Sequence, residues 1–293
     1  MKLPQNQLKG VGVALVTPFT EDYQLDLASF EKLLAHTTAI GVDYWVIQGT
    51  TGESPTTTAK EKKVLLEFAK QNNPKNLPIV YGIGGNNTEN LLQIIQETDF
   101  SGITAILSAS PYYNKPSQAG IVAHYEKLAE ASPVPIILYN VPGRTASNLT
   151  AETTLKLAQH PNIIGIKEAS GNLLQCMEIA RLKPQDFLLI SGDDMLTVPM
   201  ISFGAVGVIS VMANALKAFN DMTHYALAGD FAKATEKMFE ILPLNDLMYV
   251  EGNPVGIKQL LAEMGVCGSQ VRLPLVKASK ELAEKIRKAM QKS

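Results

Sequence analysis

Short apolar runs alternate with longer amphipathic stretches at a regular spacing along the chain. A continuous apolar run bounded by Gly, Pro or Asn is typical of a strand that is buried on both faces. Apolar residues recurring at three- and four-residue intervals indicate an amphipathic helix. We predict strands at Val11–Val16, Tyr44–Gln48, Pro78–Gly82, Ala105–Ser108, Ile136–Tyr139, Ile163–Lys167, Phe187–Ser191 and Gly207–Val211.

A helical pattern follows each predicted strand. Thr88, Ser117 and Thr150 supply start signals for three of these helices, because their hydroxyls can cap free backbone N–H groups. Parallel strands joined by crossover helices form either a closed barrel or an open doubly wound sheet. Eight evenly spaced units without a composition break favour the closed (β/α)8 TIM barrel. The helices are predicted at Leu27–Ile40, Ala59–Gln71, Glu89–Glu97, Gln118–Ala131, Ala151–Gln159, Leu173–Arg181, Met195–Phe203 and Ala215–Ala228.

The chain continues beyond the eighth unit with a C-terminal extension of three predicted helices. These are Phe231–Leu242, Pro254–Glu263 and Ser279–Lys292. Their Met and Leu spacings are more typical of packing faces than of a cofactor site. We therefore divide the chain into a catalytic barrel, residues 1–229, and a C-terminal helical region, residues 230–293.

Composition narrows the function classes. The chain has 293 residues, 46% hydrophobic and 18% charged, with a net charge of −2, which gives no basis for binding nucleic acid or an anionic membrane. Cys176 and Cys267 lack metal-ligand spacing and are expected to be buried thiols in a reducing compartment. Residues 1–10 carry no apolar signal core, and Val11–Phe19 is too short to span a bilayer. A cytoplasmic protein is expected.

The predicted strand Ile163–Lys167 ends in a lysine at a point where the run should still be buried. Desolvation disfavours the charged form of a lysine side chain. The neutral amine is a nucleophile toward carbonyl groups. Lys167 is therefore the leading candidate for a catalytic nucleophile.

Other polar residues follow the predicted strands, where barrel enzymes carry their active sites. Tyr139 ends the neighbouring strand and is either a general acid/base or a buried tyrosine bonded to backbone. The Gly49–Ser54 turn offers backbone N–H groups and the hydroxyls of Thr50 and Thr51 to a small carboxylate, or is a plain strand-to-helix turn. Arg144 either grips a carboxylate or is simply solvated.

Two cofactor classes lack support in the sequence. Gly82–Asn87 follows a strand but lacks the last glycine of a dinucleotide-binding fingerprint. The four histidines show no ligand spacing, so a zinc-dependent mechanism is not expected. We expect neither a metal nor an organic cofactor. The histidines are His36, His124, His160 and His224.

Three motifs in combination carry a family resemblance: Gly49-Thr50-Thr51-Gly52-Glu53, Tyr139-Asn140 and Gly165–Asn172, and Pro111–Pro116 matches as well. With them, the chain resembles the dihydrodipicolinate synthase / N-acetylneuraminate lyase superfamily of class I aldolase-type barrels, from Gly12 to the C-terminal helices. The segment Tyr139–Thr145 contains an arginine that is typical of the synthase branch and unusual in the lyase branch.

The resemblance implies a reaction and a set of roles. Lys167 would form a Schiff base with pyruvate, which condenses with aspartate 4-semialdehyde to give 4-hydroxy-tetrahydrodipicolinate, the committed step toward diaminopimelate and lysine. Tyr139 would relay protons, and Thr51 would link it to Tyr113 from a neighbouring subunit of a homotetramer, a dimer of dimers. Arg144 would position the carboxylate of the semialdehyde.

The resemblance also implies the surroundings of pyruvate. Thr50 and Thr51 would hold its carboxylate, with Gly192 and Ile209 lining the site. Two alternatives stay open: a sugar-acid aldolase such as N-acetylneuraminate lyase, with the same Lys167 chemistry, and a catalytically silent barrel that binds a ketoacid. Arg144 is the residue that discriminates the synthase from the lyase.

Feedback inhibition by lysine, common in relatives, is expected to be weak or absent. Ser54, Asn86 and Tyr112 stand where ligand residues of the allosteric site are expected from the resemblance. The positions that hold His, His and Glu in sensitive enzymes are different here. They are occupied by Ala59, Lys62 and Asn90. The loss of a carboxylate and the gain of a cation should weaken binding of the lysine amine.

Overall fold

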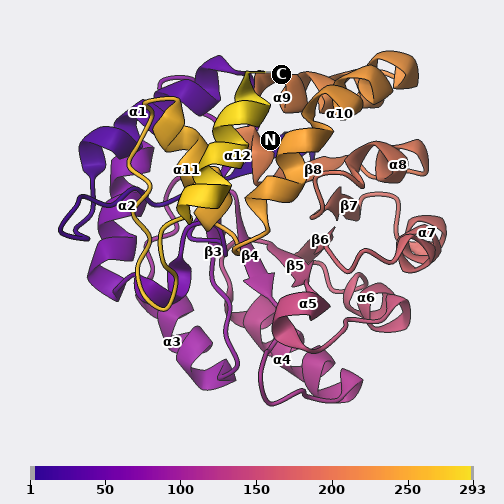
Figure 1. Ribbon diagram of the computed structural model, residues 1–293. Coiled ribbons are helices and arrows are strands. Elements are labelled where there is room, and N and C mark those ends of the chain that lie inside the picture. The colour runs from indigo at the N-terminus through magenta and orange to yellow at the C-terminus, as the bar shows by residue number, and fades with distance from the viewer. Residues whose placement is uncertain (1–3, 292–293) are drawn as a thin grey trace. The chain divides into compact units, whose positions relative to one another are not determined.

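Eight parallel strands form a closed barrel in chain order, which confirms the predicted (β/α)8 class (Figure 1). The computed structural model describes residues 4–291. The predicted strand positions agree with the structure to within two residues at each end. The strands are β1 (Gly10–Ala14), β2 (Tyr44–Ile47), β3 (Ile79–Gly82), β4 (Ala105–Ala109), β5 (Ile136–Asn140), β6 (Ile163–Glu168), β7 (Leu188–Ser191) and β8 (Gly207–Ser210).

The helices also follow the predicted order, with one short helix, α5, that the sequence pattern did not indicate. The α-helices are α1 (Leu27–Ala39), α2 (Ala59–Gln71), α3 (Thr88–Glu97), α4 (Gln118–Ala131), α5 (Pro142–Thr145), α6 (Ala151–Leu157), α7 (Leu173–Leu182), α8 (Thr197–Ser202), α9 (Lys217–Leu227), α10 (Phe231–Asn245), α11 (Val255–Glu263) and α12 (Lys280–Met290). Short 3-10 helices are η1 (Pro4–Gln7), η2 (Ser54–Thr56), η3 (Met212–Asn214) and η4 (Asp246–Met248).

Two helix ends differ from the prediction for identifiable reasons. Helix α3 is capped by Asn87, whose side chain accepts from the backbone N–H of Asn90, so Thr88 is the first helical residue rather than the cap. Helix α10 continues through Pro243 to Asn245. A proline removes one helical hydrogen bond, but Leu244 beyond it is fully buried, and this burial favours the extra turn. Of the predicted last helix, residue 292 lies outside the described residues.

The chain divides into two compact units, each described by itself. The first comprises the residues up to Lys9 together with Pro78–Ile209, and the second comprises Gly10–Leu77 and the residues from Ser210 onward. The predicted boundary at residue 229 falls between α9 and α10, inside the second unit. It stays a prediction about where the βα repeats end.

In the first unit, strands β5 and β6 pair in parallel with Tyr139 opposite Lys167 and Asn140 opposite Glu168. Every residue of β5 and of β6 is buried. Helices α4, α6 and α7 lie on the outer side of these strands (Figure 1). Burial on both faces explains why the sequence of β6 reads as a continuous apolar run up to Lys167.

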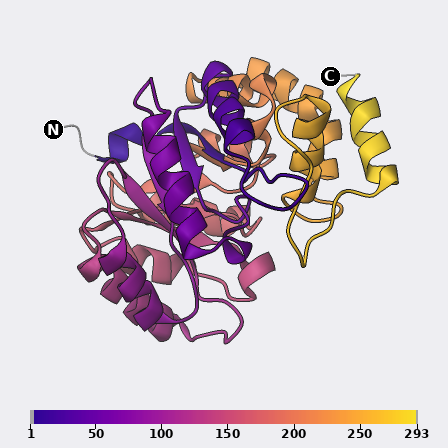
Figure 2. The ribbon, with the colours of Figure 1, turned by 90° about the vertical axis from the view of Figure 1, so that its left-hand side faces the viewer.

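In the second unit, α11 and α12 pack side by side at the C-terminal end of the chain (Figure 2). Leu260 and Leu261 of α11 and Ile286 of α12 are fully buried, and Ile241 of α10 is 1% exposed. Leu260 and Leu261 thus belong to a packing face as predicted, whereas Leu242 is 42% exposed and Met238 and Met264 are half-buried, so the predicted apolar stripe is only partly a packing face. Within the described part of the chain, no helix combines the length and the apolar character that crossing a bilayer requires.

Candidate active site

Lys167 and Tyr139 form the centre of the candidate site in the first unit. Lys167 is 6% exposed, and its Nζ atom lies 4.4 Å from the centroid of the Tyr139 ring. Among residues 4–291, neither Lys167 Nζ nor the Tyr139 hydroxyl has a hydrogen-bond partner. The sequence left open that the Tyr139 hydroxyl is bonded to the backbone, and the structure shows no such bond within the described residues. A buried amine and a buried phenol with free hydrogen-bonding capacity lie beside each other.

Gly192, which follows β7, lies directly against the Lys167 side chain. A Cβ atom at position 192 would lie 3.0 Å from both Cγ and Cε of Lys167 and 2.7 Å from Cβ of Ala169. Any larger residue would push the lysine aside. The structure thus places Gly192 against the aliphatic part of the Lys167 side chain, and Ile209 on β8 of the same unit is buried. The part of both residues in a pyruvate site stays a prediction.

A buried polar network, which the sequence did not reveal, lies at the ends of β5 and β6. Glu168 is 1% exposed, and within residues 4–291 it forms no ion pair with a Lys, Arg or His side chain. Its Oε2 accepts from Asn140 Nδ2 at 2.9 Å and from Gln175 Nε2 at 2.9 Å, and its Oε1 accepts from the Ser170 N–H at 2.7 Å. Burying a carboxylate is unfavourable unless such donors satisfy it. The network therefore fixes the strand end that carries Lys167.

The same network anchors the loop that carries Arg144. The side chain of Asn140 accepts from the Leu149 N–H at 2.9 Å and donates to Asn148 Oδ1 at 2.8 Å. The residues immediately before and after the loop are thereby tied together. Arg144, on α5 in between, is exposed. An exposed guanidinium on an anchored loop is suited to bind a carboxylate that arrives from solvent.

The turn that carries Thr50 and Thr51 lies in the second unit. It is closed by backbone bonds from Gly52 N to Gly49 O and from Glu53 N to Thr50 O. Thr51 is buried, and its Oγ1 accepts from Asn253 Nδ2 at 3.0 Å. Thr50 is half-buried, and its hydroxyl has no hydrogen bond within the described residues. Both hydroxyls thus retain a proton to donate.

The structure contains a second buried lysine, Lys258 on α11, that the sequence pattern did not indicate. It is fully buried, and its Nζ donates to Glu53 Oε1 at 2.5 Å and to the Gln270 carbonyl at 2.6 Å. Burial lowers the pKa of Lys258, and Glu53 opposes that shift. Its position three residues from both Val255 and Leu261, on one apolar helix face, was the available signal. Because Lys258 Nζ already donates two hydrogen bonds, this lysine is suited to a structural role. Lys167, whose Nζ has no such partner, is suited to react.

The remaining predicted residues lie on loops and helix ends. Tyr113 is 87% exposed, with a left-handed φ of 74°. Asn86 Nδ2 donates to the Tyr112 carbonyl at 3.1 Å, so these two allosteric candidates meet in the first unit. Ser54 begins η2 in the second unit. Burial lowers the pKa of Lys62, one of the replacements on α2.

Cys176 and Cys267 are free and buried, as predicted. Within residues 4–291, no group of three or more His, Cys, Asp or Glu side chains is arranged to hold a metal ion.

The model of the dihydrodipicolinate synthetase family matches residues 7–293. A 4-hydroxy-tetrahydrodipicolinate synthase of Cytophaga hutchinsonii is 52% identical over 281 residues, covering 96% of this chain and 95% of the relative. The solved structure of a monomeric dihydrodipicolinate synthase variant is 35% identical, with a TM-score of 0.95 and coverage of 99% and 98%. That of an Acinetobacter baumannii dihydrodipicolinate synthase complexed with pyruvate is 35% identical, with a TM-score of 0.94 and coverage of 97% and 98%.

Proposed function

The chain belongs to the dihydrodipicolinate synthetase family, and we propose that it condenses pyruvate with aspartate 4-semialdehyde to give 4-hydroxy-tetrahydrodipicolinate. This is the activity named for relatives that match nearly its whole length. The observation that carries the proposal in this chain is the free amine of Lys167 stacked on Tyr139. It is a Schiff-base lyase of the route to diaminopimelate and lysine.

The chemistry begins at Lys167. Its neutral amine attacks the pyruvate carbonyl carbon, and loss of water leaves a protonated imine. The imine withdraws electrons, so the pyruvate methyl group releases a proton and becomes an enamine. The enamine carbon bonds to the aldehyde carbon of the semialdehyde. The amine of the semialdehyde then attacks the imine carbon, which closes the ring and releases Lys167.

Tyr139 and the other predicted site residues suit this sequence of steps. A ring face attracts a nearby cation, so Tyr139 stabilises the protonated imine as well as the ammonium. Its free hydroxyl acts as the proton donor and acceptor. In this proposal Arg144 holds the carboxylate of the semialdehyde, and Thr50 and Thr51 hold that of pyruvate. All of these residues end or follow barrel strands, where barrel enzymes carry their sites.

A homotetramer, a dimer of dimers, is part of the proposal. Tyr113 of one subunit would complete the proton relay of the next. In support, Tyr113 is 87% exposed in the single chain, and aromatic residues are enriched at subunit interfaces. We place the enzyme in the cytoplasm, and its two free buried thiols fit a reducing compartment.

Borohydride trapping tests the proposed function directly. Incubation with pyruvate and sodium borohydride should reduce the imine and add a stable label to the peptide that contains Lys167. The buried Lys258 is the internal control, and its peptide should stay unlabelled. Absence of label at Lys167 contradicts the proposal.

A paired assay separates the synthase from the lyase. One protein preparation is given pyruvate plus aspartate 4-semialdehyde and, separately, N-acetylneuraminate. We expect condensation without cleavage of the sugar acid, because Arg144 suits the short carboxylate of the semialdehyde. Cleavage of N-acetylneuraminate at the higher kcat/KM would instead favour the lyase.

A further inference from the structure

The C-terminal region, which the sequence assigned to packing, reaches the turn that carries Thr51. Asn253 stands 202 positions after Thr51, yet its Nδ2 lies 3.0 Å from Thr51 Oγ1. Asn253 is itself buried, 7% exposed, and its Oδ1 has no hydrogen-bond partner within the described residues. Its amide therefore has one identified polar contact, the hydroxyl of a predicted substrate-binding residue.

The direction of this hydrogen bond decides what Thr51 can offer a substrate. A threonine hydroxyl has one proton and two acceptor sites, and an amide NH2 group only donates. Because Asn253 occupies an acceptor site, the proton of Thr51 stays available for another acceptor. An ionised carboxylate accepts and cannot donate. The Thr51 hydroxyl is therefore left with its proton free to be donated to a carboxylate.

The same turn is locked at Glu53 by further residues of the C-terminal region. Glu53 adopts a left-handed φ of 54°, which a residue with a side chain rarely takes without support. Its Oε1 pairs with Lys258 Nζ at 2.5 Å, and its Oε2 accepts from the Arg272 N–H at 2.9 Å. Both oxygens are thus held, two residues after Thr51.

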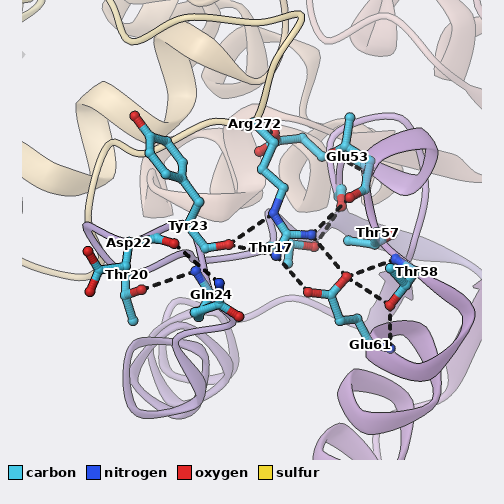
Figure 3. Close-up of polar contacts among 12 residues, drawn as sticks. Thr17, Thr20, Asp22, Tyr23, Gln24, Glu53, Thr57, Thr58, Glu61 and Arg272 are labelled. Carbon is cyan, nitrogen blue, oxygen red and sulfur yellow. Dashed lines mark hydrogen bonds and ion pairs between the residues drawn. The ribbon is translucent and has the colours of Figure 1, made fainter.

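The Arg272 side chain forms further hydrogen bonds within the second unit. Figure 3 shows its guanidinium lying between the Tyr23 carbonyl and the Glu61 carboxylate. Its Nη1 also donates to the Thr56 carbonyl at 2.8 Å. The Glu53 side chain and the Thr56 carbonyl that follows it are therefore both held by one C-terminal arginine. The position of the turn depends on the extension and not only on β2.

We propose that Asn253 is a positioning residue for pyruvate: its amide turns the proton of Thr51 toward the substrate carboxylate, and the Glu53–Lys258 pair keeps the turn in reach of that amide. This inference rests on the proposed function, since it takes pyruvate as the carboxylate that Thr51 binds. It assigns the C-terminal region a part in substrate binding.

Two variants at position 253 test the direction of the hydrogen bond. Asn253→Ala removes the donor, and Asn253→Asp keeps the shape but replaces the donor with an acceptor. In both, KM for pyruvate should rise by about tenfold or more, which corresponds to the loss of one well-placed hydrogen bond. KM for aspartate 4-semialdehyde should change by less than about twofold. The matched control is Arg287→Ala, which breaks the exposed Arg287–Glu263 pair of the same region and should change neither KM.

The ion pair is tested by replacing both of its members together. A single substitution would leave a buried charge unpaired and can prevent folding. The double variant Glu53→Gln with Lys258→Met keeps the volumes and removes both charges. It should raise KM for pyruvate in the same direction as Asn253→Ala, with a thermal unfolding transition retained.

The outcomes separate the inference from the proposed function. If the unaltered enzyme forms no borohydride-trapped adduct with pyruvate, the proposed function fails. If it does form the adduct and the Asn253 variants keep the original KM for pyruvate, only the inference fails. A normal KM in Asn253→Asp alone also overturns it, because an ionised carboxylate cannot donate to Thr51. Equal rises in KM for both substrates would show general disruption and would likewise contradict a positioning role.

Discussion

Lys167 Nζ lies 4.4 Å from the centre of the Tyr139 ring, and the two residues stand opposite each other in the register of β5 and β6. The contact is with the face of the ring and leaves the Tyr139 hydroxyl without a hydrogen-bond partner among the described residues. The ring and the hydroxyl can therefore serve different steps. The ring stabilises a cation on the lysine, and the hydroxyl moves protons.

Two variants of Tyr139 should separate these roles. Tyr139→Phe keeps the ring, so borohydride trapping of pyruvate at Lys167 should persist, while kcat for condensation falls by roughly 100- to 1,000-fold. Tyr139→Leu removes the ring as well and should slow trapping too. Steady-state kinetics and the rate of adduct formation measure both effects. Equal trapping rates in the two variants would contradict a role for the ring.

Arg144 should affect the second substrate selectively. Arg144→Ala removes the guanidinium from the anchored loop, and kcat/KM for aspartate 4-semialdehyde should fall by about 10- to 100-fold, as for the loss of a charge-assisted hydrogen bond. Arg144→Lys keeps the charge but not the bidentate geometry and should recover only part of this loss. KM for pyruvate and trapping at Lys167 should stay unchanged in both. A matching rise in KM for pyruvate would argue against the assigned role.

Mixing subunits tests whether Tyr113 acts across an interface. Lys167→Ala and Tyr113→Phe should each have low activity alone. When the two are unfolded and refolded together, hybrid assemblies should contain sites with an intact Lys167 from one subunit and an intact Tyr113 from the other. Activity should then rise well above the sum of the separate preparations. Sedimentation should show a tetramer, and no gain on mixing would mean that Tyr113 acts within its own subunit or not at all.

The Glu61–Arg272 pair should make part of the free energy of unfolding depend on pH in the acidic range. Hydrogen bonding to the Arg272 guanidinium lowers the pKa of Glu61 from 4.5 to about 2. A lowered folded-state pKa stabilises the fold above pH 4.5, and this stabilisation is lost as the pH falls from 4.5 toward 2. Glu61→Gln should thus cost roughly 1–2 kcal/mol near pH 6 and less near pH 3. Urea unfolding at both pH values measures the difference.

A matched control for this pH dependence is Glu281→Gln. Glu281 pairs with Lys285 on the exposed face of α12. An exposed pair contributes little to stability, so this variant should follow the unaltered protein at both pH values. A Glu61→Gln cost that does not change with pH would contradict the linkage.

L-Lysine should inhibit weakly or not at all. Ala59, Lys62 and Asn90 replace the residues expected in lysine-sensitive relatives. The cationic side chain of Lys62 should also repel the amine of the lysine ligand. Initial rates should remain nearly constant up to millimolar lysine, and a low-micromolar inhibition constant would contradict this. The combined variant Ala59→His, Lys62→His and Asn90→Glu should increase the sensitivity, because it restores a carboxylate for the lysine amine.

The sequence alone determined the barrel, the order of its elements and the leading catalytic candidates. Strands buried on both faces must be apolar throughout, so their runs and the amphipathic stretches between them can be read locally. A charged residue that ends such a run, as Lys167 does, is conspicuous for the same reason. Family motifs then supplied the remaining site residues and their expected roles.

Only the tertiary structure revealed what supports those residues. Glu168 reads as an ordinary charge after Lys167, and Asn253 and Lys258 read as parts of a packing helix and its start. Their partners are distant in sequence: Thr51 lies 202 positions from Asn253, and Glu53 lies 205 positions from Lys258. Local periodicity reports which face of an element is buried, but not which residue of another element it meets. That pairing depends on how the folded chain brings the segments together, and it determines how Lys167 and Thr51 are held.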